Sequence, residues 1–320
     1  MNLNRIEWID VSKLIGIILV VISHTVPLEY SIIRGTIFSF HMPLFIIASG
    51  VVFKPNNSKE NLKKKISKDI NTLLKPLCIV WLIETVYDLL VNDSLFSLKY
   101  FIKKTISLFF SQGNPFYLFG YCFDSVGSVW FLGMLLSLRL IYNCICKNKN
   151  RKIQLFEIWS LSIICYLLRK KLVLPFSAEN AMITLPLFDY GYYYRKKIID
   201  SDNNVITNFL VWIILFIFIA YKSNSYLELA SHNYPLYPLL FLCSIEGTMM
   251  VFKIAKKINS QIVCYLGTKT LPLLCIHSLD YILSFIWKTN NMIIIQFIFR
   301  FALIIIIFAI MNSIADNSTR

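Results

Sequence analysis

Two residues near the start of the chain, a lysine and a histidine, have side chains that can do chemistry and a spacing that puts them on one helix face. Lys13 and His24 are eleven residues apart, about 1100° of rotation in an α-helix, which leaves them on one face and about 16 Å apart along the axis. Asp10 lies on nearly the same stripe. Imidazole is the usual general base near neutral pH, and the lysine would place a cation at the cytoplasmic mouth of the helix. The alternative is that Lys13 anchors a helix at a membrane surface and His24 makes only an interhelical hydrogen bond.

A second imidazole belongs to His41, some six residues into the next apolar segment. His24 lies about five residues from the end of the first apolar segment. Two antiparallel helices would place these rings at similar depth, where they could act as a base and its partner. The alternative for His41 is a purely structural role between the two helices.

The last two apolar segments each contain an ionisable residue. The first of these segments contains His277, followed by Asp280, and the second contains Arg300. Arg300 lies at a depth comparable to that of His277. Ionisable side chains inside a membrane cost about 2.5–3.5 kcal/mol and are by default functional candidates. We therefore expect Arg300 to face a cavity or a carboxylate, with a purely structural ion pair as the alternative.

Two further candidates lie in the middle of the chain. Glu84 and Asp88 are four residues apart and share one helix face. Trp130 and Asp124 flank a glycine-containing entry to a helix. For these residues a structural role is the alternative.

The elements that must position these residues are long apolar helices. Of the 320 residues 57% are hydrophobic and only 16% are charged, against about 25% in soluble domains. Several apolar runs approach the roughly 20 residues that cross a bilayer. We predict an all-α polytopic membrane bundle of about ten helices, forming a single transmembrane domain over residues 1–320. The predicted spans cover residues 14–28, 35–53, 77–91, 129–145, 156–168, 181–194, 205–221, 234–252, 262–287 and 292–314.

The basic residues predict the orientation. With the N-terminus inside, the Lys and Arg residues of the inner segments outnumber those of the outer segments by more than two to one, as the positive-inside rule requires. The exception to this rule is the basic run Arg169–Lys171, which this orientation places on the outer side of the membrane. We therefore predict a multi-pass protein of the cell membrane with both termini cytoplasmic.

The distribution of charge and of cysteines argues against nucleic-acid-binding, disulfide-rich and metal-binding proteins. The net charge of +14 is concentrated in short loops, which favours anionic lipid or a phosphorylated cosubstrate over nucleic acid. Most of the eight cysteines lie in apolar runs, where they behave as small hydrophobes. Neither a disulfide framework nor metal-ligand spacing emerges, so no metal is expected.

The motifs around these residues resemble the integral-membrane acyltransferase 3 superfamily. They are Arg5-x-x-Trp8-Ile9-Asp10, Lys13-x10-His24, and Phe40-His41-Met42-Pro43-Leu44-Phe45 with Ser49-Gly50. Looser matches are Val129-Trp130-Phe131-Leu132, Gly191 through Lys196, and Leu266-Gly267-x-x-x-Leu271 leading to His277. The branch of fucose 4-O-acetylase-like proteins is the most similar, and the resemblance spans nearly the whole chain.

The resemblance implies a ten-helix bundle that moves an acyl group, usually acetyl from cytoplasmic acetyl-CoA, to a hydroxyl of an extracytoplasmic or lipid-linked glycan. The family's basic residue matches Lys13 and its essential histidine matches His24. We expect catalysis from His24, His41 and Asp10, donor binding from Lys13, Arg195 and Arg300, and acceptor binding from Glu84, Trp130 and His277.

The sequence departs from the superfamily in one motif and leaves one rival function open. An Arg-x-x-Arg motif is absent, and Arg195-Lys196-Lys197 is only a rough substitute. The chain also resembles the membrane domain of the serine racemases of vancomycin resistance, which is associated with serine uptake. A membrane transport module is therefore the alternative function, although no inverted repeat is visible in the sequence.

Overall fold

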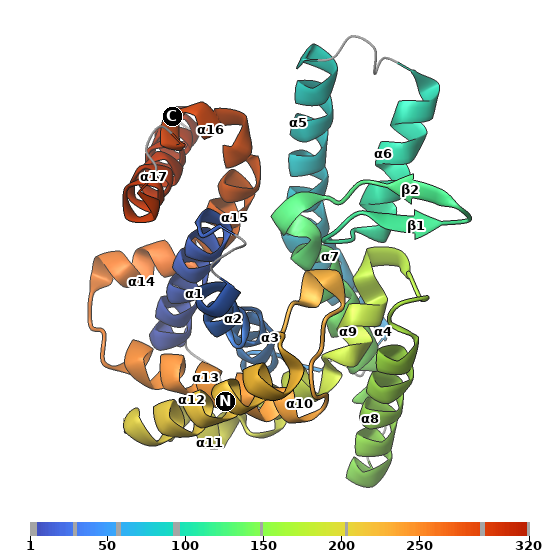
Figure 1. Ribbon diagram of the computed structural model, residues 1–320, viewed down its shortest axis with the longest axis vertical. Coiled ribbons are helices and arrows are strands. Elements are labelled where there is room, and N and C mark those ends of the chain that lie inside the picture. The colour runs from blue at the N-terminus through green and yellow to red at the C-terminus, as the bar shows by residue number, and fades with distance from the viewer. Residues whose placement is uncertain are drawn as a thin grey trace. The chain divides into compact units, whose positions relative to one another are not determined.

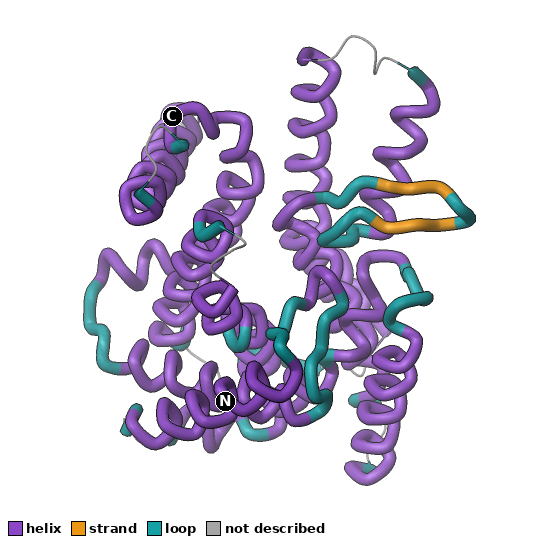
Figure 2. Tube along the Cα trace, viewed as in Figure 1, coloured by secondary structure: helices purple, strands orange, loops and turns teal. Residues whose placement is uncertain are grey.

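The computed structural model describes residues 5–27, 31–55, 59–91, 97–147, 150–201, 204–288 and 292–318. These residues are mostly helical, with one short β-hairpin (Figure 2). The helical fold class is therefore confirmed. The chain divides into two compact units: unit 1 comprises residues 1–51, 193–228 and 233–320, and unit 2 comprises residues 52–192 and 229–232. The single domain over residues 1–320 stays a prediction.

Unit 1 is built around its first helix. Helix α1 (Glu7–Thr25) contacts α3, α13, α14, α15 and α17 (Figure 1), so its residues lie at the centre of this unit. The other helices of unit 1 are α2 (Ser31–Phe38), α3 (His41–Val51), α11 (Arg195–Ile199), α12 (Ile206–Ser223), α13 (Leu239–Lys256), α14 (Gln261–Thr268), α15 (Thr270–Leu279), the 3-10 turn Asp280–Leu283, α16 (Ser284–Trp287) and α17 (Ile293–Ser318).

Unit 2 contains the hairpin and the middle helices. Its elements are α4 (Lys59–Asp69), the π-turn Ile70–Leu74, α5 (Lys75–Val91), α6 (Leu98–Phe110), β1 (Phe116–Leu118), β2 (Tyr121–Phe123), α7 (Trp130–Ile145), α8 (Arg151–Leu168), α9 (Ala178–Ile183), most of α10 (Leu185–Tyr193), and the 3-10 turns Gly127–Val129, Pro175–Ser177 and Leu229–Ser231.

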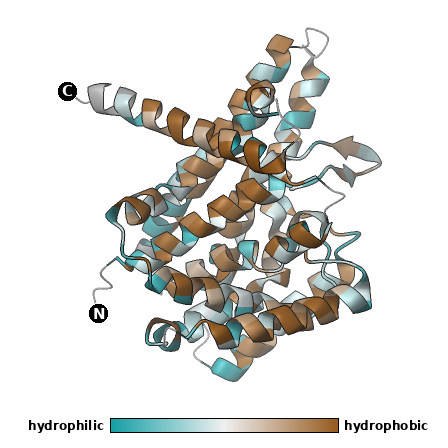
Figure 3. Ribbon diagram, turned by 60° about the vertical axis from the view of Figure 1, so that its left-hand side comes forward, coloured by the Kyte–Doolittle hydropathy of each residue, from teal (hydrophilic) through white to brown (hydrophobic). Residues whose placement is uncertain are grey.

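Five helical segments of the described chain are long and apolar enough to cross a membrane. They are Glu7–Thr25, Ser31–Val51, Gly127–Ile145, Ile206–Ser223 and Ile293–Ser313. A sixth is the pair α14 and α15–α16, if this pair is counted as one span. The most apolar of these segments is in α17, with a mean hydropathy of 2.8. Only 17% of this segment is buried, so its hydrophobic surface is available to lipid (Figure 3). The number of ten spans stays a prediction.

Three predicted spans are interrupted, and the one predicted over residues 35–53 has a turn at Ser39 and Phe40, between α2 and α3. The span predicted over residues 262–287 bends by 64° between α14 and α15. Lys269 leaves the helical conformation there, and Pro272 lies in the first turn of α15, where its missing N–H costs no hydrogen bond. The span predicted over residues 181–194 divides at Thr184, between α9 and α10.

Candidate functional site

His24 lies in the last turn of α1. The helix ends at Thr25 because Pro27 favours an extended backbone at the residue before it, and Val26 has φ −69° and ψ 125°. The side chain of His24 is exposed, whereas those of Ser23 and Thr25 are buried. The imidazole is therefore accessible although the helix around it is packed.

A buried ion pair lies beside this imidazole. Arg300 donates from Nε to Asp280 Oδ2 at 2.6 Å and from Nη2 to Asp280 Oδ1 at 2.8 Å. The His277 Nδ1 lies 3.0 Å from the same Oδ2. All three residues are 6% exposed or less. A bidentate arginine–carboxylate pair of this kind is rigid and directional, so the carboxylate of Asp280 fixes the orientation of the His277 ring.

This cluster joins three helices around His24. The rings of His24 and His277 lie 5.3 Å apart between centroids. Arg300 Nη1 also donates to Thr25 Oγ1 at 3.2 Å, which ties α17 to the end of α1. His41 and Arg34 lie within electrostatic range of His24, together with Arg300. The accessible imidazole is thus held against an oriented histidine among basic groups.

The other end of α1 carries a second charged group. The carboxylate of Asp10 accepts from Arg5 Nε at 2.7 Å and from Lys13 Nζ at 3.2 Å. Gly267 of α14 packs directly on this turn, because a Cβ there would lie 2.2 Å from the backbone oxygen of Asp10. A side chain at Gly267 would therefore separate the two helices. Lys13 remains partly exposed, as a residue that meets an anion must.

His41 is placed differently from His24. It begins α3, is 4% exposed, and its Nδ1 lies 3.0 Å from the backbone oxygen of Ile37. Its ring stacks on Phe38 at 4.9 Å. These contacts support a packing role, and the ring that lies beside His24 is His277.

The remaining candidates lie on other elements. Arg195 begins α11. Glu84 is 9% exposed on α5, within electrostatic range of Lys104 and Asp88. Trp130 is 6% exposed at the start of α7. The structure therefore brings together His24, His277 and Arg300, and separately Asp10 with Lys13.

Unit 2 has an ion-pair cluster of its own. Arg151 binds Asp189 through Nη1 and Nη2 at 2.8 and 2.7 Å, and the Tyr142 hydroxyl donates to Asp189 at 2.7 Å. The Tyr142 ring packs on Phe53 and Phe188. This arrangement buries a tyrosine among aromatic side chains.

Lys65 borders the same region. Its Nζ lies 3.5 Å from the centre of the Phe53 ring and donates to the backbone oxygen of Lys54 at 2.8 Å. Burial lowers the pKa of Lys65 to about 8, although Asp69 opposes the shift. The amine is therefore partly neutral at a mildly alkaline pH.

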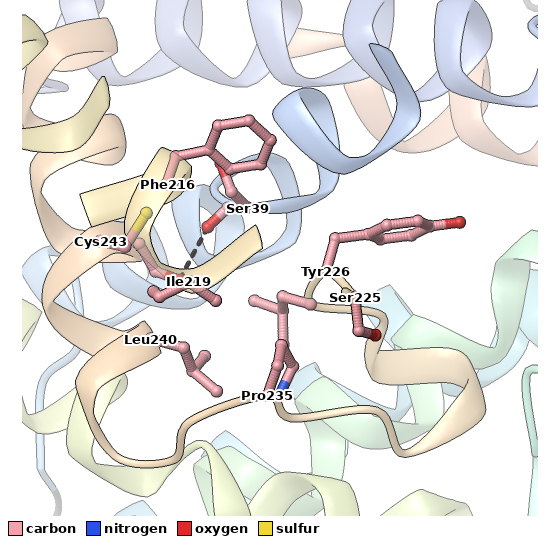
Figure 4. A pocket seen from close by; sticks show the side chains of 10 residues that line it. Ser39, Phe216, Ile219, Ser225, Tyr226, Pro235, Leu240 and Cys243 are labelled. Carbon is pink, nitrogen blue, oxygen red and sulfur yellow. Dashed lines mark hydrogen bonds between the residues drawn. The ribbon is translucent and has the colours of Figure 1, made fainter. Parts of the chain in front are cut away.

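A small pocket of unit 1 lies apart from the charged residues (Figure 4). It is mostly apolar, and Ser39 in its wall is hydrogen-bonded by Trp212 Nε1 at 3.0 Å and by Ser244 Oγ at 2.7 Å. Its lining includes neither histidine nor a charged residue. Its described lining therefore provides no imidazole or carboxylate for general base catalysis.

The comparison with known families decides the identity. A family model described as an acyltransferase domain matches residues 6–314. The chain belongs to the acyltransferase 3 family. This membership implies acyltransferase activity, and together with the apolar helices it indicates a membrane protein. Neither a curated protein nor a solved structure gives a significant match.

Some residues that bind charged side chains, in unit 1 or in unit 2, were not among the predicted site residues. Asp280 had a sequence signal, because Arg300 needs a carboxylate at its depth. Thr25 had no signal, since a threonine at a helix end is common. His232 and Glu179 also had none, because they are 53 positions apart and meet only through the fold.

Proposed function

We propose that this protein is a membrane O-acyltransferase of the fucose 4-O-acetylase-like branch. It transfers an acetyl group from cytoplasmic acetyl-CoA to a hydroxyl of an extracytoplasmic or lipid-linked glycan. Both termini are cytoplasmic, and the chain crosses the membrane about ten times. The observation that carries the proposal is the accessible His24 imidazole beside the buried His277–Asp280–Arg300 cluster.

His24 is the general base in this proposal. It removes the proton of the acceptor hydroxyl while the oxygen attacks the thioester carbonyl. The new C–O ester bond forms, the C–S bond breaks, and the proton passes from His24 to the departing CoA sulfur. General base catalysis of this kind contributes about 10²–10⁴ to a rate.

The buried cluster positions the base. Asp280 orients His277 as a carboxylate orients an imidazole in hydrolytic triads. The Arg300 guanidinium is held by Asp280 and Thr25. These contacts favour a positioning role for Arg300 and His277 over the donor-binding and acceptor-binding roles expected from the sequence.

The donor binds through the other end of α1. Lys13 stays partly exposed while Asp10 holds it through an ion pair, so the ammonium can meet a CoA phosphate without losing its position. Arg195, on the short helix α11, is a second phosphate contact in this proposal. A phosphate bound by both residues would be held more tightly than by either alone.

The decisive experiment is the His24→Ala variant in membranes supplied with radiolabelled acetyl-CoA. We expect acetyl incorporation into glycan to fall at least a hundredfold, while acetyl-CoA still raises the melting temperature of the purified protein. The matched control is Lys64→Ala, which removes a 72% exposed side chain of α4. Wild-type incorporation in His24→Ala would refute the catalytic role.

Serine uptake is the second candidate, and one observation favours it. The bend of 64° between α14 and α15 is a broken helix, a feature that many transporters use at their substrate sites. Uptake of labelled serine into proteoliposomes without acetyl-CoA would support transport. A transporter has no reason to be stabilised by acetyl-CoA, so the melting experiment separates the two functions.

A further inference from the structure

Within the described residues, one arginine near the end of α1 binds no carboxylate. Arg34 belongs to α2 and is partly exposed, and its Nη1 donates to the backbone oxygen of Val26 at 3.3 Å. Its Nε is buried without a hydrogen bond, and its Nη2 also has no acceptor in the described part of the chain. A buried donor without an acceptor costs about 1–3 kcal/mol. The proposed reaction gives this arginine no role.

Arg300 shows how a guanidinium in the same region is used when a carboxylate is present. Its Nη1 donates to Thr25 Oγ1 at 3.2 Å, so the two arginines bind neighbouring residues at the end of α1 through the same nitrogen. The Nε and Nη2 of Arg300 bind the two oxygens of Asp280 at 2.6 and 2.8 Å. The Nε–Nη2 edge of Arg34 has the same shape, and this edge matches a carboxylate or a phosphate.

Packing holds the side chain of Arg34 in place. Its guanidinium carbon lies 5.2 Å from the centre of the Phe38 ring, and that ring packs on Tyr226 at 5.6 Å. Gly35 brings α2 close to the same tyrosine, because a Cβ at this glycine would lie 3.0 Å from Tyr226 Cβ. The guanidinium is therefore positioned by a cation–π contact and by the close packing of its helix.

The arginine lies beside the base of the proposed reaction. Val26, which accepts its hydrogen bond, is two residues beyond His24, and Arg34 lies within electrostatic range of that imidazole. Asp280 balances the charge of Arg300, whereas Arg34 forms no ion pair in the described ranges of the chain. A cation at the edge of apolar helices is costly, and such residues face cavities or substrate paths. The charge beside His24 therefore favours an acceptor that carries a negative charge.

We propose that Arg34 binds a carboxylate or phosphate of the acyl acceptor through Nη2 and Nε, and so selects acidic acceptors over neutral ones. The inference rests on the proposed function, because it adds a charge requirement to the molecule that reacts at His24. The anion satisfies the buried Nε and balances the guanidinium, as Asp280 does for Arg300. A neutral hydroxyl can accept one of these hydrogen bonds but leaves the charge unbalanced. Arg34 determines specificity and takes no part in proton transfer.

The test uses Arg34→Gln in the full-length protein. The probe is envelope glycan from the expression host, separated by anion exchange into acidic and neutral fractions, with acetyl-CoA at saturation. The wild type should acetylate the acidic fraction preferentially. In Arg34→Gln we expect the acidic glycan concentration that half-saturates transfer to rise about tenfold, with the rate at saturation within about twofold of wild type. Arg34→Lys keeps the charge but loses the planar pair of donors, so it should recover part of this loss.

The matched control is Lys222→Gln, which removes an exposed cation at the end of α12 in the same unit. This variant should leave both the half-saturating concentration and the rate unchanged. Equal use of the two fractions by the wild type would overturn the inference. An unchanged half-saturating concentration in Arg34→Gln, with stabilisation by acetyl-CoA intact, would also overturn it while leaving the proposed function in place.

A lipid headgroup is the other source of such an anion. The melting temperature is therefore measured in phosphatidylcholine nanodiscs with and without phosphatidylglycerol. Stabilisation by phosphatidylglycerol in the wild type but not in Arg34→Gln, with unchanged use of glycan, would assign the arginine to lipid and overturn the inference. A wild type that acetylates no glycan and is not stabilised by acetyl-CoA would refute the proposed function. Direct binding of the acidic fraction to the wild type and Arg34→Gln would then still decide the role of Arg34.

Discussion

Units 1 and 2 each contain a bidentate arginine–aspartate pair with a third donor on the same carboxylate. In unit 1 Arg300 and Asp280 are joined by His277, and the arginine side chain is 7% exposed. In unit 2 Arg151 and Asp189 are joined by Tyr142, and the arginine side chain is 28% exposed. The chemistry of the two ion pairs is the same, but their third partners differ.

Because of this difference, the unit 1 pair belongs to a candidate reaction site, whereas the unit 2 pair has a structural role. The imidazole of His277 lies beside the accessible ring of His24. The ring of Tyr142, in contrast, packs against the aromatic side chains of Phe53 and Phe188. A buried ion pair is therefore weak evidence of function by itself. The group that it orients decides what it does.

The largest expected difference between the two pairs lies in stability. Asp280→Asn leaves Arg300 buried with a neutral partner, and we expect a loss of about 3–5 kcal/mol. Asp189→Asn should cost only about 1 kcal/mol, because Arg151 can reach water. Thermal unfolding in detergent compares the variants. Equal losses would show that both pairs are equally dependent on burial.

The next effect concerns activity. His277→Gln removes the ring that Asp280 orients, and acetyl transfer should fall about 10- to 100-fold. Tyr142→Phe removes one hydrogen bond, costs about 1 kcal/mol of stability, and should leave the transfer rate within twofold of wild type. Rates are measured in membranes at saturating acetyl-CoA. A large loss in Tyr142→Phe would assign catalytic importance to unit 2.

The smallest effect concerns Lys65, beside the unit 2 pair. Its pKa is about 8 when folded and about 10.4 when unfolded, so between these values the unfolded chain binds more protons. The wild type should therefore gain stability as pH rises through this window. Lys65→Met should lack this gain, with Lys64→Met as the control. The measurement is the melting temperature from pH 7.5 to 10.5, and parallel profiles for wild type and Lys65→Met would contradict the prediction.

The helical nature of the fold was predictable, but its interruptions were not. Apolar length alone indicates the helix that contains His24 and the one that contains Arg300. The bend at Lys269 depends on how Gly267 packs against Asp10, and that contact joins segments more than 250 residues apart. The mean hydropathy of the segment does not reveal such a bend, because the helices on its two sides are equally apolar.

The candidate site was predictable where burial demands a partner. Arg300 at membrane depth required a carboxylate, and Asp280 provides it. His277 was a candidate, but its place beside His24 depends on the packing of α15 on α1. His41 shared the depth argument with His24, yet the Ile37 backbone oxygen engages its ring. Residue type and depth predict which groups need partners, and tertiary packing determines which partners they have.

In the proposed reaction, the unbroken course of α1 sets the length of the acyl donor that can meet both Lys13 and His24. Lys13 and His24 belong to one unbroken helix, so their separation of about 16 Å is constant. A donor whose phosphate remains at Lys13 needs a flexible chain of about that reach to bring its thioester to His24. Acetyl phosphate is shorter than this separation, so the proposed donor site predicts that the protein discriminates against this smaller activated acetate.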